Sequence, residues 1–250
     1  MPLIVRPSDL TAIAPMRERY RAEMNCQIIH DSIHVRAGWT REFILEIDDD
    51  AAGYGSVAVG GPWREKHALY EFFVEREHRS RVFDLFEALL AECGAKAIET
   101  QSNDRLLTVM LHTFARDVRA ESILFEDAFE TALHPAGVEF RAATAADIEA
   151  LTERDLSEEA GWLVTMNGEI AGAGDVLWHY NPPYGDVYMA IAEPFRGRGL
   201  GAYLVQELKR VCRERGGVPA ARCNVANHAS RKTLQKAGFV PCGNLLAGDL

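Results

Sequence analysis

The chain has 250 residues, of which 48% are hydrophobic and 26% charged, and its formal net charge is −10. That length allows one large domain or two small ones, and an acidic chain without basic blocks interleaved with aromatic residues is not expected to bind nucleic acid. The acidity is uneven: residues 1–137 hold 15 Lys and Arg against 23 Asp and Glu (a net of −8), whereas residues 138–250 hold 12 against 14 (a net of −2).

The first half reads as an α/β unit with a mixed sheet. Apolar runs bounded by turn residues predict strands, and apolar residues at helical spacing predict helices, the first of them capped by Ser8-Asp9. The expected strands are residues 3–6, 43–47, 54–59, 69–74, 97–100 and 122–125, and the expected helices are residues 10–24, 82–93 and 106–114.

The second half repeats this order after the breaker His134-Pro135-Ala136-Gly137, so we expect two domains, residues 1–136 and 137–250. Its first helix is much shorter than the equivalent helix of the first half, and Asn167-Gly168 predicts a tight hairpin turn. The expected strands are residues 138–141, 161–166, 169–178, 187–192, 218–225 and a last one from 239, and the expected helices start near 144–147, cover 200–213 and lie within 227–237.

Residues 196–201, Arg-Gly-Arg-Gly-Leu-Gly, lie between a predicted strand and a predicted helix. Three glycines at alternate positions let the backbone turn sharply and approach a ligand closely. The first amides of the helix then point at that ligand, and the helix dipole favours an anion. This loop is therefore predicted to hold the pyrophosphate of a nucleotide-like cofactor, in the half of the chain that is nearly neutral.

The two halves can be placed in register with Val74 at Ile191 and residues 79–84 at residues 196–201. All three glycines are lost in the first copy, where Asp84 falls at the position of Gly201. A carboxylate there would repel a pyrophosphate, and a branched side chain would crowd the backbone. The first half is thus predicted to have the same fold without the anion site.

Two other glycine-loop types do not match. A dinucleotide-binding fold needs GxGxxG within a βαβ unit, and a P-loop needs GxxxxGK[ST]. Residues 191–201 instead resemble the coenzyme A loop of the GCN5-related N-acetyltransferases (GNATs), whose pattern is [RQ]-x-x-G-x-[GA]. Residues 227–239 resemble the second signature of that family, an Asn followed by a helix that ends in Gly-Phe.

The resemblance covers residues 138–250 and extends to residues 1–130 as a degenerate copy. It implies an α/β protein with two tandem GNAT domains, each a mixed, mostly antiparallel sheet flanked by helices. The second domain would bind acetyl-CoA, with a splayed strand on the pantetheine arm and the loop amides on the pyrophosphate. The implied cofactor-binding residues are Met189, Ala190, Ile191, Arg196, Gly197, Arg198, Gly199, Leu200, Gly201, Ala202, Asn227 and Ser230.

The sequence departs from the family at the group that protonates the leaving thiolate. Many members carry a Tyr seven residues after the Asn, but that position is Leu234 here, which cannot donate a proton. The base and the acid that amine acetylation needs must come from elsewhere. Asp186 and Tyr188, near the splayed strand, are the catalytic candidates, and the further alternatives are Asp175, His179 and Glu193.

The function that the resemblance implies is direct attack of a primary amine, on a small molecule or a peptide, on the acetyl thioester of acetyl-CoA. The alternative is a non-catalytic acyl-CoA-binding sensor or interaction protein, because Leu234 replaces the Tyr and the first copy is degenerate. The first domain would wall the substrate cleft or form the interface of a homodimer, and its acidity would suit a cationic amine.

The remaining signals concern compartment and metals. Five scattered cysteines without a CxxC pair predict neither a disulfide framework nor a zinc site. The first six residues lack the apolar core of a signal peptide and no run reaches membrane-spanning length, so we expect a soluble cytoplasmic protein that contacts no membrane. His30 and His34 are four residues apart, as helical metal ligands would be, but without a third ligand they are expected at the surface.

Overall fold

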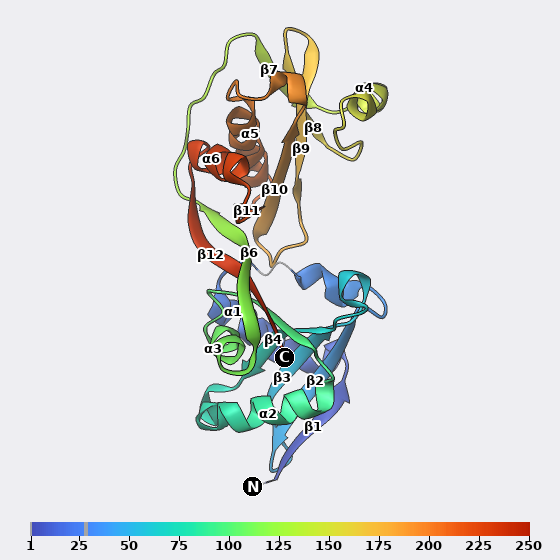
Figure 1. Cartoon of the computed structure of the whole chain (residues 1–250), viewed down its shortest axis with the longest axis vertical. Coiled ribbons are helices and arrows are strands. Elements are labelled where there is room, and N and C mark those ends of the chain that lie inside the picture. Colours follow the sequence, from blue (N-terminus) through green and yellow to red (C-terminus); the bar gives the residue numbers. More distant parts are fainter. Residues whose placement is uncertain (1, 28–29) are drawn as a thin grey trace. The chain divides into compact units, whose positions relative to one another are not determined.

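Figure 1 shows the computed structural model of the chain, which describes residues 2–27 and 30–250. The chain divides into two compact units. The N-terminal unit comprises Met1–Ser122 together with Gly243–Leu250, and the C-terminal unit comprises Ile123–Cys242.

This division differs from the expected border between residues 136 and 137. The segment before that border packs on the C-terminal unit, where Thr131 Oγ1 and the Leu133 amide donate to Gln206 Oε1 at 2.8 and 2.7 Å. The Pro-Gly signal therefore marks a bend inside one unit. At the other end, the last strand leaves the C-terminal unit and pairs with a strand of the N-terminal unit, an exchange that no local sequence signal announces.

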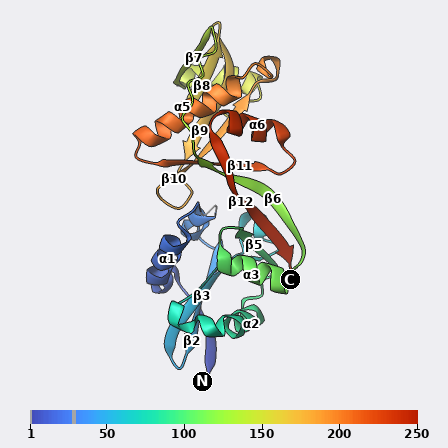
Figure 2. The ribbon, with the colours of Figure 1, turned by 90° about the vertical axis from the view of Figure 1, so that its left-hand side faces the viewer.

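The N-terminal unit is a sheet with helices on both faces. α2 and α3 cover one face with Leu85, Phe86 and Leu107, and α1 covers the other with Ile13 and Tyr20 (Figure 2). Neighbouring strands are antiparallel except β4 and β5. The strands, in spatial order, are β1 (Leu3–Ser8), β2 (Thr40–Ile47), β3 (Asp50–Ala58), β4 (Ala68–Val74), β5 (Ala97–Gln101) and the end of β12 (Phe239–Asp249), and the helices are α1 (Leu10–Met24), α2 (Val82–Cys93) and α3 (Arg105–Phe114).

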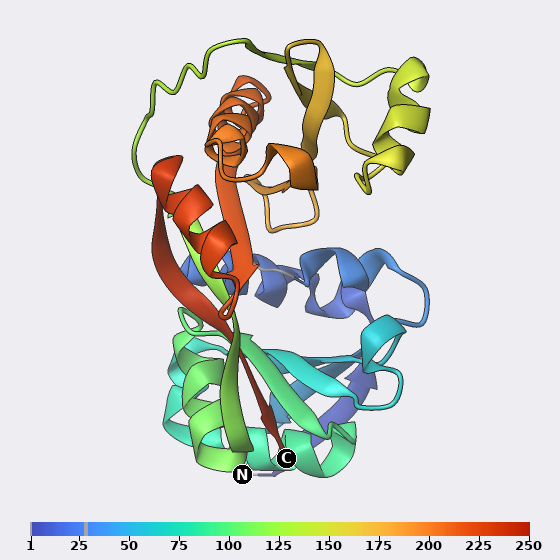
Figure 3. The same ribbon diagram turned by 45° about the horizontal axis from the view of Figure 1, so that its top comes forward.

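The C-terminal unit repeats this plan. Leu204, Val205 and Leu208 of α5 pack on Val187 and Val164 of the sheet, and α5 and α6 lie side by side, orange and red in Figure 3. The strands, in spatial order, are the start of β12, the end of β6 (Arg116–Asp127), β11 (Val218–Asn224), β10 (Tyr184–Ile191), β9 (Glu169–Leu177), β8 (Trp162–Met166) and β7 (Val138–Ala142), and the helices are α4 (Ile148–Glu153), α5 (Leu200–Glu214) and α6 (His228–Lys236). Among the helices described, none is long and apolar enough to cross a membrane.

Equivalent glycines confirm the predicted duplication. Gly53 faces Val74 in the N-terminal sheet, and Gly172 faces Ile191 in the C-terminal sheet. A Cβ at these glycines would lie 2.2 and 2.8 Å from a backbone oxygen of the facing strand, so only Gly fits at either position. Val74 and Ile191 are the residues that the sequence alignment of the two halves places together.

The prediction that His30 and His34 lie at the surface is wrong. His34 is buried, with Nδ1 3.1 Å from Glu42 and Nε2 3.1 Å from Glu71, and His30 Nε2 lies 2.7 Å from a half-buried Glu99. A strand carboxylate lies beside each histidine, and both ring nitrogens of the buried His34 have partners.

Candidate functional site

The site begins where β10 and β11 diverge. Their parallel ladder covers only Tyr184–Asp186 against Val218–Ala220, although β10 runs to Ile191 and stays paired with β9 over that length. The edge of β10 beyond Asp186 therefore leaves its ladder with β11, and its backbone groups on that side are available to a ligand. This is the splayed strand that the family resemblance implies.

The glycine loop adopts the geometry predicted for it. Gly197 and Gly199 have φ values of +76° and +81°, which non-glycine residues rarely adopt. α5 starts at Leu200 after a glycine N-cap, so no side chain caps its first amides. A Cβ at Gly201 would lie 3.1 Å from Thr233 Cγ2 and 3.2 Å from Met189 Cε, so glycine keeps the loop, β10 and α6 close together.

A groove of about 760 Å³ joins the loop, the splayed edge of β10 and α6. All the sequence-predicted cofactor residues except Arg198 line it. The Arg198 guanidinium instead donates to the Pro194 carbonyl oxygen at 3.2 Å and lies 5.7 Å from the centre of the Phe195 ring. The Arg198 side chain therefore does not point into the groove, where the expected phosphate contact would be made.

The groove is positively charged in a chain whose net charge is −10. Arg196, Lys232 and Lys236 line it, and the lining residues include no Asp or Glu. In the described residues none of these three cations forms an ion pair with a carboxylate, so their charges are available to an anionic ligand. Sequence reasoning missed the two lysines, although their spacing of four on a helix after the Asn signature places them on one face.

The Asn signature has a structural role that leaves part of the side chain available. Asn227 is the N-cap of α6, and its Oδ1 accepts a hydrogen bond from the Ser230 amide at 2.9 Å. That bond orients the side chain so that its amide nitrogen remains available as a donor. Leu234, at the position of the family Tyr, is buried in the core of the unit.

Asp186, the first catalytic candidate, lies at the last rung of the β10–β11 ladder and is buried. Its Oδ2 is 2.9 Å from His179 Nε2 and 3.5 Å from the Arg222 guanidinium. The structure thus brings together two residues that the sequence had offered as separate candidates. It adds Arg222, for which the sequence carried no signal.

Tyr188, the second candidate, lies on the same face of the sheet, opposite Asp175 on β9. Burial raises the pKa of its hydroxyl, which is hydrogen-bonded to Ser157, so it stays protonated at neutral pH. The Asp175 carboxylate accepts hydrogen bonds from the amides of Gly161 and Val176, at 3.0 and 2.7 Å. Tyr188 is therefore suited to donate a proton, and Asp175 is engaged in holding the backbone.

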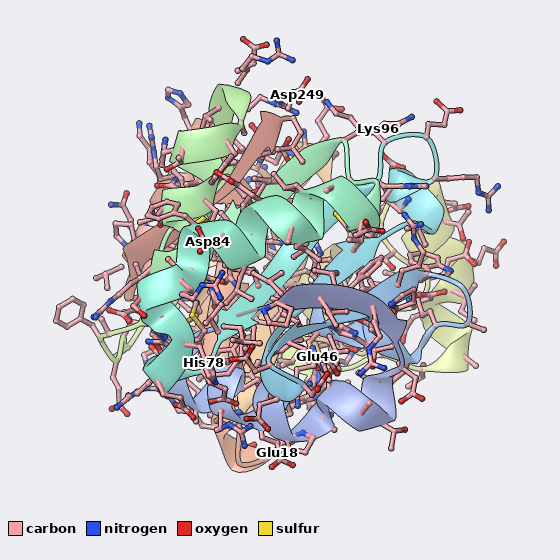
Figure 4. All side chains as sticks on the ribbon, turned by 90° about the horizontal axis from the view of Figure 1, so that it is seen from below. Glu18, Glu46, His78, Asp84, Lys96 and Asp249 are labelled. Carbon is pink, nitrogen blue, oxygen red and sulfur yellow. The ribbon has the colours of Figure 1, made fainter. Side chains whose placement is uncertain are left out.

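The loop is altered in the first copy, as the alignment predicts. A 3-10 helix over Arg76–Arg81 stands where the glycine loop would be, and Asp84 lies on the first turn of α2 (Figure 4). The Asp84 carboxylate lies 3.0 Å from Arg81 Nε. In the described part of the chain, no group of three or more His, Cys, Asp or Glu side chains is arranged to hold a metal ion.

Comparisons with known proteins agree with this geometry. Residues 123–239 match the family model described as the acetyltransferase (GNAT) family. Among solved structures, a GNAT-family acetyltransferase from Colwellia psychrerythraea is 13% identical, with a TM-score of 0.77 and 99% of each chain covered. A GCN5-related N-acetyltransferase from Sphaerobacter thermophilus is 14% identical, with a TM-score of 0.64, 98% of this chain and 94% of that chain covered.

A tandem GNAT protein from the clavulanic acid biosynthesis pathway is also 14% identical, with a TM-score of 0.59, 98% of this chain and 97% of that chain covered. None of the curated proteins compared with the chain matches it. Residues 123–239 therefore match the GNAT acetyltransferase family, and the chain as a whole shares the fold of a tandem GNAT protein.

Proposed function

We propose that the chain is an N-acetyltransferase that moves an acetyl group from acetyl-CoA to a primary amine. The observation that carries the proposal is the groove of the C-terminal unit. It combines the diverging strands β10 and β11 with three cations that form no ion pair among the described residues. Coenzyme A fits this groove because it joins phosphates, which suit the cations and loop amides, to an extended arm, which suits a free strand edge.

The residues at the end of the ladder support the chemistry. Bound acetyl-CoA would supply a thioester; the amine nitrogen forms a bond to its carbonyl carbon as the carbon–sulfur bond breaks. An amine attacks only when neutral, and His179 would take its proton while the buried carboxylate of Asp186 stabilises the imidazolium. Backbone amides at the free edge of β10 would stabilise the negative charge that develops on the thioester oxygen.

A second proton must reach the departing thiolate. Leu234 cannot supply it, whereas the protonated hydroxyl of Tyr188 or a water molecule can. We include Tyr188 in the proposal as the donor or as a wall of the acceptor site. The donor role predicts that Tyr188→Phe slows acetyl transfer without weakening the binding of acetyl-CoA.

A panel of primary amines, incubated with the protein and acetyl-CoA and assayed for free thiol, tests the proposal. We expect turnover of at least one amine, reduced about 100-fold or more in His179→Gln, as is typical when a general base is removed. Binding of acetyl-CoA without turnover of any amine would contradict it and favour the alternative, a non-catalytic acyl-CoA sensor. That alternative rests on Leu234 and on the altered first copy.

A further inference from the structure

The residue cluster at the end of the β10–β11 ladder has a feature that amine acetylation alone does not use. Arg222 lies two residues beyond the last paired residue of β11, Ala220. Its neighbours Ala221 and Cys223 pack in the core with α5 and α6, so Arg222 points to the opposite face, where Asp186 lies. The Arg222 guanidinium thus lies next to the point where β10 and β11 diverge.

Arg222 is the most exposed member of this cluster. Its side chain is 36% exposed, against 24% for His179 and 6% for Asp186. Within the described residues it forms one ion pair, at 3.5 Å from Asp186, and its guanidinium lies 5.9 Å from the centre of the buried Tyr180 ring. A guanidinium has five N–H donors in a planar fork that matches a carboxylate, so a single long contact leaves most of them available.

The opposite charges of Asp186 and Arg222 are complementary to those of a zwitterion. An ammonium group beside Asp186 and a carboxylate beside Arg222 would give both protein charges a partner, and no charge would be left uncompensated in a partly buried site. An amine without a carboxylate would bring a second cation close to Arg222, where like charges repel. Asp186 and Arg222 therefore favour acceptors that carry both groups on one carbon atom.

We propose that the acceptor is an amino acid, whose α-amino group lies at the His179–Asp186 pair and whose carboxylate is held by Arg222. This inference rests on the proposed function, because it assumes that the acetyl thioester lies where β10 and β11 diverge, beside the acceptor. Arg222 is then the residue that determines specificity, and it takes no part in the bond exchange itself.

Matched acceptors test the inference. The pairs are alanine with ethylamine, leucine with isoamylamine, phenylalanine with phenethylamine and lysine with cadaverine, each differing by the carboxylate alone. We expect at least one amino acid to exceed its amine at least tenfold in kcat/KM. Arg222→Leu should remove that preference mainly by raising KM, and Arg222→Lys should restore part of it. Arg215→Leu, at the end of α5, is the control.

A binding measurement separates this inference from the proposed function. Calorimetry of the same pairs with protein saturated with CoA should show the amino acid binding and the amine not, and Arg222→Leu should abolish the difference while CoA affinity stays unchanged. The inference is overturned if amines bind and react as well as their amino acids, or if Arg222→Leu leaves the preference intact. Failure of the proposed function would instead appear as amino-acid binding without thiol release.

Discussion

Arg79 and Arg196 make the same hydrogen bond in the two copies of the fold. Arg196 Nε donates to the Ile191 carbonyl oxygen at 3.0 Å, and Arg79 Nε donates to the Val74 carbonyl oxygen at 3.0 Å. In the first copy the Arg79 guanidinium also binds both carboxylate oxygens of Glu23, at 2.9 and 2.6 Å. The cation that lines the groove in one copy is thus neutralised in the other.

The loop conformation should matter for binding more than for stability. Gly199 and Gly216 have nearly equal φ values, +81° and +79°, and Gly216 lies at the end of α5, outside the groove. Replacing either with Ala costs about 1–2 kcal/mol of backbone strain. We expect similar falls in the unfolding midpoint, but only Gly199→Ala should weaken acetyl-CoA binding, about tenfold (about 1.4 kcal/mol). Equal CoA affinities of the two variants would refute this role.

The two lysines of α6 should carry the salt dependence of binding. Lys232→Ala combined with Lys236→Ala should weaken acetyl-CoA binding at least about tenfold, and the remaining affinity should change less with ionic strength. Lys96→Ala, at an exposed position of the N-terminal unit (Figure 4), is the matched control. Titrations at two salt concentrations distinguish a lost electrostatic contact from a general loss of structure.

A buried lysine should be important for the stability of the C-terminal unit. Lys209 Nζ donates to the carbonyl oxygens of Phe129 and Ala237, at 2.8 and 2.6 Å, and lies 2.7 Å from Asp127 Oδ1. Lys209→Met leaves these groups without that partner, and we expect it to reduce the free energy of unfolding by about 3 kcal/mol. Arg210→Met, at the next residue, removes only exposed ion pairs and should cost under about 1 kcal/mol in denaturant titrations.

The N-terminal unit should lose stability as the pH rises from mildly acidic to mildly basic values. Burial disfavours the charged form of His34, but Glu71 and Glu42 beside it outweigh this effect and raise the pKa of His34. Burial also raises the pKa of Asp104 to about 6. Both groups bind their proton more tightly in the folded state, so the stability they contribute is present at low pH and is lost as the pH rises through their folded pKa values.

Thermal unfolding between about pH 5.5 and pH 8 checks this sign. Burial would raise the pKa of Glu71, but Arg17 and His34 hold it well below its usual value, so Glu71 stays ionised and adds no slope in this range. The midpoint should fall toward pH 8, and His34→Gln should flatten the fall. His112→Gln, at an exposed position of α3, should leave it unchanged. A midpoint that rises with pH in the wild type would show that the sign is wrong.

Local signals were enough to predict most elements and the groove. α1 and α2 have their predicted bounds because their end signals are explicit: the Asp9 side chain accepts from the Ala12 amide at 2.9 Å, and Gly94 follows α2 with φ +62°. The glycine loop and the Asn signature are equally local. The loop follows from its glycines and the Asn signature from the family resemblance, and all the residues that they imply except Arg198 line one groove.

What the sequence could not show depends on contacts between distant residues. Arg222 is beside Asp186 only because of the short β10–β11 ladder, and His34 is buried because strand carboxylates face it. The end of β12 pairs with β5, more than 140 residues earlier in the chain (Leu245 with Gln101). The sequence of residues 243–250 does not indicate that this segment pairs with β5, so its place in the N-terminal unit could not be predicted.

The central claim is that the chain binds acetyl-CoA in the groove of the C-terminal unit and nowhere else. Calorimetric titration of the full chain with acetyl-CoA, run in parallel on Gly199→Glu, tests it most directly. We predict one binding site per chain in the wild type and no detectable binding in the variant, because a carboxylate would stand against the pyrophosphate. Absence of binding at high micromolar acetyl-CoA, a second equivalent site, or unchanged affinity in Gly199→Glu would contradict the claim.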